Sequence, residues 1–273
     1  MKKSKLIAVL LSVLLLIVLV MMMMPYVVMF VMTSHSNLEI FEGDVLSIGK
    51  YFGENIGKVF GMNYIRYFFN SFYIAVLNVI LGSLSSALAA YSLSKFTYKG
   101  REKLFVAVLI TMMIPGQLGL IAFIIMMGKL GWVNTHLPFI LPALNNTFGV
   151  FWFTMYMRGS VPKEIIESAR MDGAHEVSIF FRLVLPLIKP ALVVFGFQTF
   201  LGSWNSFTTP SLLLNKDHLW TIPLAITKLG NMYTADYAAR ITGLAIATLP
   251  LLVILGFCSK YFSQGMVTGA IKG

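Results

Sequence analysis

The amino-acid sequence predicts an all-α, polytopic membrane protein with six transmembrane helices and with both termini in the cytoplasm. Hydrophobic residues make up 58% of the 273 positions and charged residues only 12%, which is far more apolar than a soluble domain. The apolar residues gather in runs that are long enough to cross a bilayer. The Lys and Arg residues lie mainly on one side of these runs, and this asymmetry sets the orientation.

The first apolar run extends over residues 6–32 and contains no charged residue, so it can span the hydrocarbon core. The basic start of the chain, Met1–Lys5, resembles the n-region of a signal peptide. The run is too long for the apolar part of such a peptide, and no A-x-A cleavage site follows it. We therefore expect an uncleaved helix, followed by an external loop that ends at residue 66.

Five further spans are expected after this loop, at 67–93, 104–128, 137–157, 187–214 and 241–259. The third span of the chain is interrupted at Pro115-Gly116. The chain then divides into the first helix with its external loop (1–66), a transmembrane core (67–262) and a cytoplasmic tail (263–273).

The distribution of charge agrees with this topology. With the N-terminus inside, the cytoplasmic segments hold 14 of the 21 Lys and Arg residues, and the external segments hold 7. The acidic residues divide almost evenly, five inside and six outside. The basic excess is therefore cytoplasmic, as the positive-inside rule requires. Topology and anionic lipid explain the net charge of +10, so no nucleic-acid partner is expected.

The loop at 158–189 is the only long polar segment between two apolar ones on the cytoplasmic side, with five basic and four acidic residues. Pro162 suits the first position of a helix, because its missing N–H would lack a partner there in any case. Glu164 and Glu167 would lie in the first turns, where the helix dipole favours carboxylates. The loop is therefore expected to begin with a short helix.

A glycine is expected to end that helix, because Gly173 can adopt the positive φ of a helix C-terminus. A second helical run, 174–185, should follow and stop at Pro186. Two short amphipathic helices joined at a glycine form a compact knob, which suits a groove in another protein.

Several kinds of chemistry are excluded by missing motifs. The sequence has no G-x4-G-K-[ST] phosphate loop, so this chain cannot hydrolyse ATP by itself. His175-Glu176 begins like a zinc-protease helix, but Ile179 stands where the second His would be needed. No G-x-S-x-G motif is present, and the single cysteine, Cys258, offers neither a disulfide nor a cysteine metal site. An enzyme is therefore not expected, and neither is a metal site.

The predicted spans carry no Asp, Glu, Lys or Arg away from their ends, where Lys189 lies. Ion-coupled carriers usually need such groups within the membrane, so a pathway for an uncharged solute, driven by another protein, is favoured. The candidate pathway residues are Gln117, Asn145, Asn146, Gln198, Trp204 and Asn205. Amides offer donors and acceptors to sugar hydroxyls and aromatic rings stack on sugars, although polar residues also join helices to each other.

One motif of the cytoplasmic loop has a defined spacing, carried by Glu167, Ser168, Ala169, Gly173, Leu183, Leu185 and Pro186. It resembles the EAA loop of ABC importer permeases, whose pattern is E-A-A-x3-G-x9-I-x-L-P. Ser168 and Leu183 depart from the pattern but keep the size of the side chain. In that family the loop is the coupling helix that docks into a cleft of a cytoplasmic ATPase. The alternative is an amphipathic loop that lies on the lipid surface.

Three later stretches carry a second resemblance: FLGSWNSF at 200–207, TIPLA at 221–225 and GMVTGAIKG at 265–273. They are similar to segments of carbohydrate importer permeases, including F-x3-W-N-x-F and the ending G-L-x-x-G-x-V-K-G. The chain is identified as a member of this family, of the maltose and glycerol-3-phosphate type, and as its smaller six-span permease subunit in the bacterial cell membrane.

The resemblance implies partners: a second permease that is a different chain, a pair of ABC ATPases that bind ATP and Mg, an external solute-binding protein and a carbohydrate. It implies no cofactor in this chain. Residues 215–240 would contact the binding protein. The implied ATPase-coupling residues are Glu164, Glu167, Ala169, Asp172, Gly173, Ala174, Leu185 and Pro186. Those implied at the ATPase interface in the tail are Gly265, Gly269 and Lys272.

Three alternatives stay open at this point. The nearest is an ABC permease for a solute other than a sugar. A secondary transporter and an intramembrane hydrolase are more distant.

Overall fold

The computed structural model describes residues 2–43, 46–230 and 235–270, and the side chains of residues 5–261 within these ranges. Most of these residues are helical. The β pairing among them is limited to an isolated bridge between Gly230 and Ala235. The all-α prediction is therefore confirmed.

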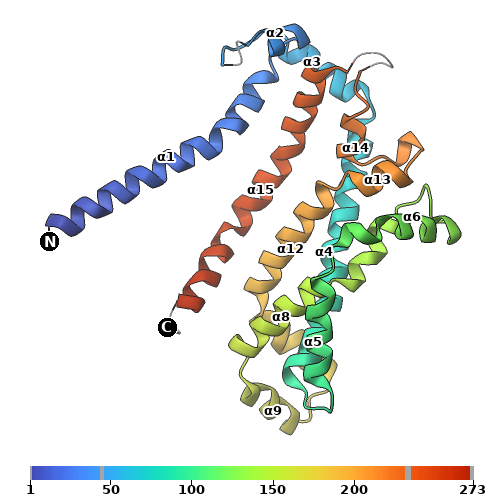
Figure 1. Ribbon diagram of the computed structural model, residues 1–273. Coiled ribbons are helices and arrows are strands. Elements are labelled where there is room, and N and C mark those ends of the chain that lie inside the picture. Colours follow the sequence, from blue (N-terminus) through green and yellow to red (C-terminus); the bar gives the residue numbers. More distant parts are fainter. Residues whose placement is uncertain (1, 44–45, 231–234, 271–273) are drawn as a thin grey trace. The chain divides into compact units, whose positions relative to one another are not determined.

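The longer helices are α1 (Lys2–Met32), α4 (Tyr64–Lys95), α5 (Arg101–Met112), α6 (Leu120–Lys129), α8 (Thr147–Ser160), α12 (Lys189–Trp204) and α15 (Tyr237–Ala270) (Figure 1). The shorter helices are α2 (Asn37–Glu42), α3 (Phe52–Gly61), α7 (Leu137–Ile140), α9 (Lys163–Met171), α10 (Glu176–Ile179), α11 (Leu185–Leu187), α13 (Thr208–Leu213) and α14 (Ile222–Ile226). Three 3₁₀ turns, η1 (Gly116–Gly119), η2 (Leu141–Asn145) and η4 (Asp217–Leu219), and one π turn, η3 (Phe180–Val184), complete the described elements.

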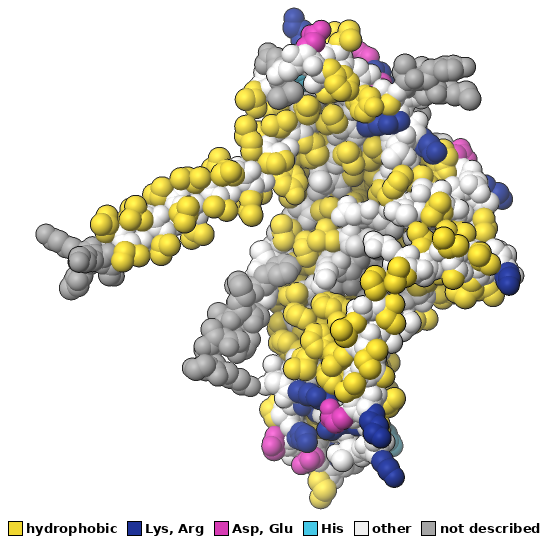
Figure 2. All heavy atoms as spheres, viewed as in Figure 1, with side chains coloured by type: hydrophobic (Ala, Val, Ile, Leu, Met, Phe, Trp, Pro, Cys, Tyr) yellow, Lys and Arg dark blue, Asp and Glu magenta, His cyan; other side chains and the backbone are white. Residues whose placement is uncertain are grey.

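The chain forms two compact units, and the first consists of Met1–Ile65 with Ala225–Leu249. Its α1 exposes apolar side chains over its length, as Figure 2 shows, which is the surface expected of a helix solvated by lipid. The amide of Asn55, on α3, is buried and donates to the carbonyls of Thr33 and His35, at 3.0 and 2.8 Å. These bonds fix the turn that follows α1.

The second unit consists of Arg66–Leu224 with Pro250–Gly273. One buried cluster joins the ends of α4 and α8 to the segment that runs from α9 into α12. Phe153, Phe180 and Phe195 are its largest members, each at most 1% exposed. Burial of aromatic side chains supplies much of the energy of such a core, so the cytoplasmic loop predicted at 158–189 is part of the packed unit.

Three helices of the described chain are long and apolar enough to cross a membrane: α1, α4 and α15. Two helix pairs pass the same test together, but each is bent by 80°: α5 with η1 and α6, and the run from α10 to α11 with α12. The described residues therefore provide three spans, or five if each bent pair counts as one. The bend of the first pair lies at Pro115-Gly116, where the sequence predicts an interruption.

The structure divides two of the expected spans. The fourth consists of α7, η2 and the 14-residue α8, because Pro138 and Pro142 occupy the first turns of the two short helices, where proline is tolerated. The fifth is divided between α12, which ends at Trp204, and α13, which begins at Thr208.

Candidate functional site

The first candidate site is the segment from α9 to α11, called the coupling segment below (Lys163–Leu187). It lies at one end of the second unit (Figure 1), where charged side chains of both signs gather in Figure 2. Ile166 is 2% exposed and packs into the core, whereas Glu164 and Glu167 are exposed. The helix therefore keeps its apolar side inward and offers its carboxylates outward.

The α9 helix ends in a Schellman motif. Gly173 has a φ of +78°, so the predicted positive φ is confirmed. The N–H of Ala174 donates to the carbonyl of Ala169 and that of Gly173 to the carbonyl of Arg170, both at 3.0 Å. This pair of bonds satisfies carbonyls that a helix end would otherwise leave unpaired. The turn between α9 and α10 is thus closed by its own backbone.

The prediction that the second helix stops at Pro186 is wrong. The π turn η3 leads directly into α11, which extends to Leu187. Pro186 occupies the first turn of α11, where a missing N–H costs little. The change of direction comes at Ile188 instead, which is fully buried.

The predicted coupling residues fall into two groups. Those exposed to solvent are Glu164, Glu167, Asp172, Gly173 and Pro186, and those half-buried against the core are Ala169, Ala174 and Leu185. The first group can meet another molecule, whereas the second anchors the segment. An additional anchor that sequence reasoning missed is Lys95, at the end of α4, which is 8% exposed and donates to the carbonyl of Val161 at 2.5 Å.

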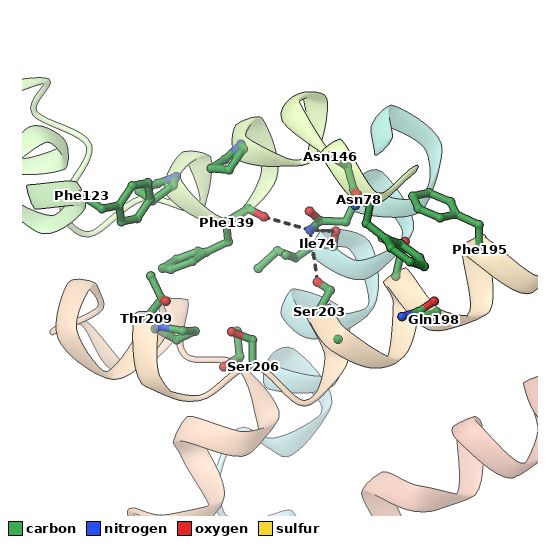
Figure 3. A pocket seen from close by; sticks show the side chains of 17 residues that line it. Ile74, Asn78, Phe123, Phe139, Asn146, Phe195, Gln198, Ser203, Ser206 and Thr209 are labelled. Atoms are coloured by element: carbon green, nitrogen blue, oxygen red, sulfur yellow. Dashed lines mark hydrogen bonds between the residues drawn. The ribbon is translucent and has the colours of Figure 1, made fainter. Parts of the chain in front are cut away.

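The second candidate site is a pocket of about 530 Å³ in the second unit, formed by α4, α6, α7, α8, α12 and α13 with neighbouring turns (Figure 3). This volume is in the range of small-molecule sites. Of the predicted pathway residues, Gln198 and Asn146 line it. None of the 17 described residues that line it is charged, so the pocket offers hydrogen bonds and aromatic faces without a fixed charge.

Asn78 is the centre of the polar wall of this pocket, and sequence reasoning missed it. Its amide lies within hydrogen-bond distance of the carbonyls of Ile74 and Phe139, at 2.8 and 2.9 Å, and of the Ser203 hydroxyl at 3.1 Å (Figure 3). The amide therefore joins α4 to α7 and α12. An amide within an apolar span was the available signal, because such a group must find partners.

The other predicted pathway residues do not line the pocket. Gln117, Asn145 and Asn205 are exposed. Trp204 is 1% exposed and lies against Phe68 and Phe200, with ring centroids 5.4 and 5.5 Å away. The indole is thus part of the packing between α12 and α4. Gly265 and Gly269 of the predicted tail lie in α15, and Lys272 lies outside the described residues.

The segment that connects α13 to α14 is held by side chains of distant elements. Asn70 donates to the carbonyls of His218 and Trp220 at 3.0 Å, and Asn134 accepts from the N–H of Asn215 at 2.6 Å. His136 donates to the carbonyl of Leu219 at 2.7 Å. Burial lowers the pKa of His136, so its ring is neutral at pH 7.

These contacts hold residues 215–220 of the predicted binding-protein region 215–240, of which residues 231–234 lie outside the described residues. Its loop is thereby held in a defined conformation, with Lys216 and Asp217 exposed.

Residues 82–268 match the family described as binding-protein-dependent transport system inner membrane component. An arabinooligosaccharides transport system permease protein, AraQ, of Bacillus subtilis (strain 168) is 34% identical over 238 residues, which are 87% of this chain and 83% of that protein. The lactose transport system permease protein LacG of Rhizobium radiobacter is 30% identical over 249 residues, 91% of this chain and 90% of that protein.

The fold is also found in a solved structure. A chain of a bacterial ABC transporter involved in the import of the acidic polysaccharide alginate superimposes with a TM-score of 0.82, at 20% identity, over 96% of this chain and 98% of that one. The family match and the relatives show a multi-pass membrane transport protein. More particularly, the chain belongs to the family of binding-protein-dependent transport system inner membrane components.

Proposed function

We propose that this chain is a permease subunit of an ATP-driven ABC importer for a carbohydrate. The family match and the relatives that carry oligosaccharides and lactose support this function. The observation that carries it is the coupling segment, in which a capped α9 presents Glu164 and Glu167 from a packed core. Such a rigid, charged knob fits a groove on a soluble partner.

The proposed complex contains a second permease, a different chain, together with a pair of ATPases and an external binding protein. ATP and Mg are bound by the ATPases, since this sequence has no phosphate loop. The chain would cross the membrane six times with both termini in the cytoplasm, so that the coupling segment and the tail, with Gly265, Gly269 and Lys272, face the ATPases. Closure of the ATPases then moves the coupling segment and tilts the helices packed on it.

The proposed solute contact is the pocket around Asn78, Gln198 and Asn146. A charged solute would lose its hydration there without gaining an opposite charge, so the pocket favours an uncharged solute. Its hydroxyls and amides can exchange hydrogen bonds with a sugar, and its Phe side chains can cover an apolar sugar face. Gln198→Ala should therefore raise the KM of uptake several-fold, whereas Gln117→Ala, outside the pocket, should leave KM unchanged.

The direct test of coupling is the exposed carboxylate of Glu167. In cells that express the complete importer, Glu167→Lys should reduce co-purification of the ATPase and abolish uptake of labelled oligosaccharide. Glu42→Lys makes the same change at an exposed position on α2, in the predicted external loop, and should leave both measurements normal. Normal ATPase binding and uptake in the Glu167→Lys variant would contradict the proposal.

A solute other than a sugar is the remaining candidate. Growth of a deletion strain on single carbon sources separates the two, because normal growth on every sugar would exclude a carbohydrate.

A further inference from the structure

Three side chains from three different helices meet beside the coupling segment. The hydroxyl of Tyr91, on α4, donates to one carboxylate oxygen of Glu176, on α10, at 2.7 Å. The guanidinium of Arg170, on α9, donates through Nε to the other oxygen at 2.6 Å. Glu176 thus joins α4 to both helices that flank the Gly173 turn.

Aromatic side chains line one side of this cluster, while the side chains of Arg170 and Glu176 stay 34% and 41% exposed. Arg170 lies over the ring of Phe96, 5.0 Å from its centroid. Tyr91 is 5% exposed and lies with its ring 5.3 Å from that of Phe96 and 5.5 Å from that of Phe180. Cation–π contacts and charge-assisted hydrogen bonds are stronger where water is partly excluded.

The geometry of the cluster differs from that of an ordinary surface ion pair. An isolated exposed pair contributes little to stability. Here the buried hydroxyl of Tyr91 needs an acceptor, and Glu176 supplies it while also holding Arg170. A network in which each group orients the next contributes more to stability than the sum of its separate pairs. It also spans the Gly173 turn, the point at which α9 could otherwise swing relative to α10.

We propose that Tyr91, Arg170 and Glu176 form a latch that makes the coupling segment and the end of α4 move as one body. These are positioning residues, and the inference rests on the proposed coupling function. With the latch closed, displacement of α9 by the ATPase is passed to α4 and hence to the pocket wall at Asn78. When the contacts among Tyr91, Arg170 and Glu176 are broken, α9 turns about Gly173 and ATP is hydrolysed without transport.

The test uses the complete importer in proteoliposomes and measures solute taken up per ATP hydrolysed. Tyr91→Phe removes one oxygen atom, and Glu176→Ala removes the shared acceptor. Each should lower this ratio by about fivefold or more, the low end of coupling between sites in proteins, while the ATPase still co-purifies. Glu176→Gln keeps an acceptor for the Tyr91 hydroxyl. Its ratio of solute taken up to ATP hydrolysed should therefore lie between those of the wild type and Glu176→Ala. Because the three groups act as a unit, adding Tyr91→Phe to Glu176→Ala should cause no further loss.

Two matched controls lie in the same unit of the protein but outside the latch. Tyr98→Phe and Glu102→Gln make the same chemical changes at exposed positions and should leave the ratio unchanged. If the unaltered importer takes up solute with ATP while Tyr91→Phe keeps the full ratio, the latch is overturned. If the unaltered importer shows no ATP-driven uptake, the proposed function itself fails. If the Glu176→Ala variant does not assemble into the importer, the ratio measured for Tyr91→Phe, which removes a single oxygen atom, decides whether the latch exists.

Discussion

The two bends of this protein have the same angle but different causes. Between α5 and the run of η1 and α6 the chain turns by 80° at residues 113–115, all of which are exposed. Between α11 and α12 it turns by 80° at Ile188, which is fully buried together with Val184. The first bend coincides with a proline that is followed by a glycine, and the second follows a π turn inside the core. Local sequence makes one bend, and tertiary packing makes the other.

The difference has a consequence for the membrane. Backbone that leaves a helix at membrane depth is tolerated only where protein or water covers it. The core of the second unit covers the bend at Ile188, whereas the bend at Pro115 is exposed. In the proposed importer, the second permease would cover the bend at Pro115.

The largest expected effect is at the packed bend. Ile188→Ala removes a fully buried side chain and should destabilise the protein by about 2–5 kcal/mol. The side chain of Ile114, at the exposed bend, is 61% exposed. Ile114→Ala should therefore change stability by no more than about 0.5 kcal/mol. Thermal unfolding of the purified variants measures both. Equal losses would show that the two bends are packed alike.

The next effect is at Gly173. Its φ of +78° is strained for any other residue, while the space that a Cβ would occupy there is open, so the cost is one of backbone conformation. Gly173→Val should lose uptake, because a β-branched residue at positive φ costs about 1–3 kcal/mol. Gly173→Asn should retain most of it, since Asn tolerates this region.

Immunoblots of membranes control for insertion of the Gly173 variants. Gly116→Ala, at the exposed bend, should be neutral because Gly116 has an ordinary φ and open space around it. Equal uptake by the Val and Asn variants would show that the Schellman turn is not needed.

A third pair of variants compares the two prolines. Pro115→Ala should allow part of the population to continue the helix from α5 into α6, because the break depends on the proline. Pro186→Ala should leave its bend unchanged, because the core sets that angle. Spin labels at the exposed positions Val106 and Ile125 report the first angle as a distance, and labels on either side of Ile188 report the second. A lengthened distance across the second bend would contradict this assignment.

The smallest effect is expected away from both bends, in the first unit. Lys58 lies 3.0 Å from Asp236. Burial tends to raise the pKa of Asp236, but the N–H of Ala239 and the ammonium of Lys58 outweigh it and hold the pKa below its usual value. Asp236→Asn should cost about 0.2–1 kcal/mol at pH 7.

The sign of the pH dependence follows from that lowered pKa. A carboxyl with a depressed pKa stabilises the folded state above its unfolded pKa of about 3.9 and loses this contribution as the pH falls below it. The difference in unfolding temperature between wild type and Asp236→Asn should therefore shrink as the pH is lowered towards 3. Glu42→Gln, at an exposed position, provides the control and should show no such change.

Much of the candidate site could be read from local sequence. The turn at Gly173, the apolar side of α9 at Ile166 and the interruption at Pro115 each depend on a few adjacent residues with strong conformational preferences. Their local energy terms are large enough that packing does not overturn them. Gln198 and Asn146 were found because amides are conspicuous in apolar runs.

Other features were beyond local reasoning. A proline such as Pro186 usually ends a helix. Here the π turn before it places Pro186 in the first turn of α11. Trp204 is of a residue type that stacks on sugars, but in the structure its ring packs against Phe68 and Phe200. The roles of Asn78 and of Tyr91 depend on partners 61 to 125 residues away in the first case and 85 in the second.

The sequence by itself determined the helical, membrane-spanning character of this protein and the glycine turn of its coupling segment. These follow from the transfer of apolar runs into lipid and from backbone preferences of single residues. Only the tertiary structure decided which amides share a pocket, where the second bend lies and which helix the coupling segment is fastened to. Those outcomes depend on packing and hydrogen bonds between residues far apart in the chain, whose geometry no local pattern specifies.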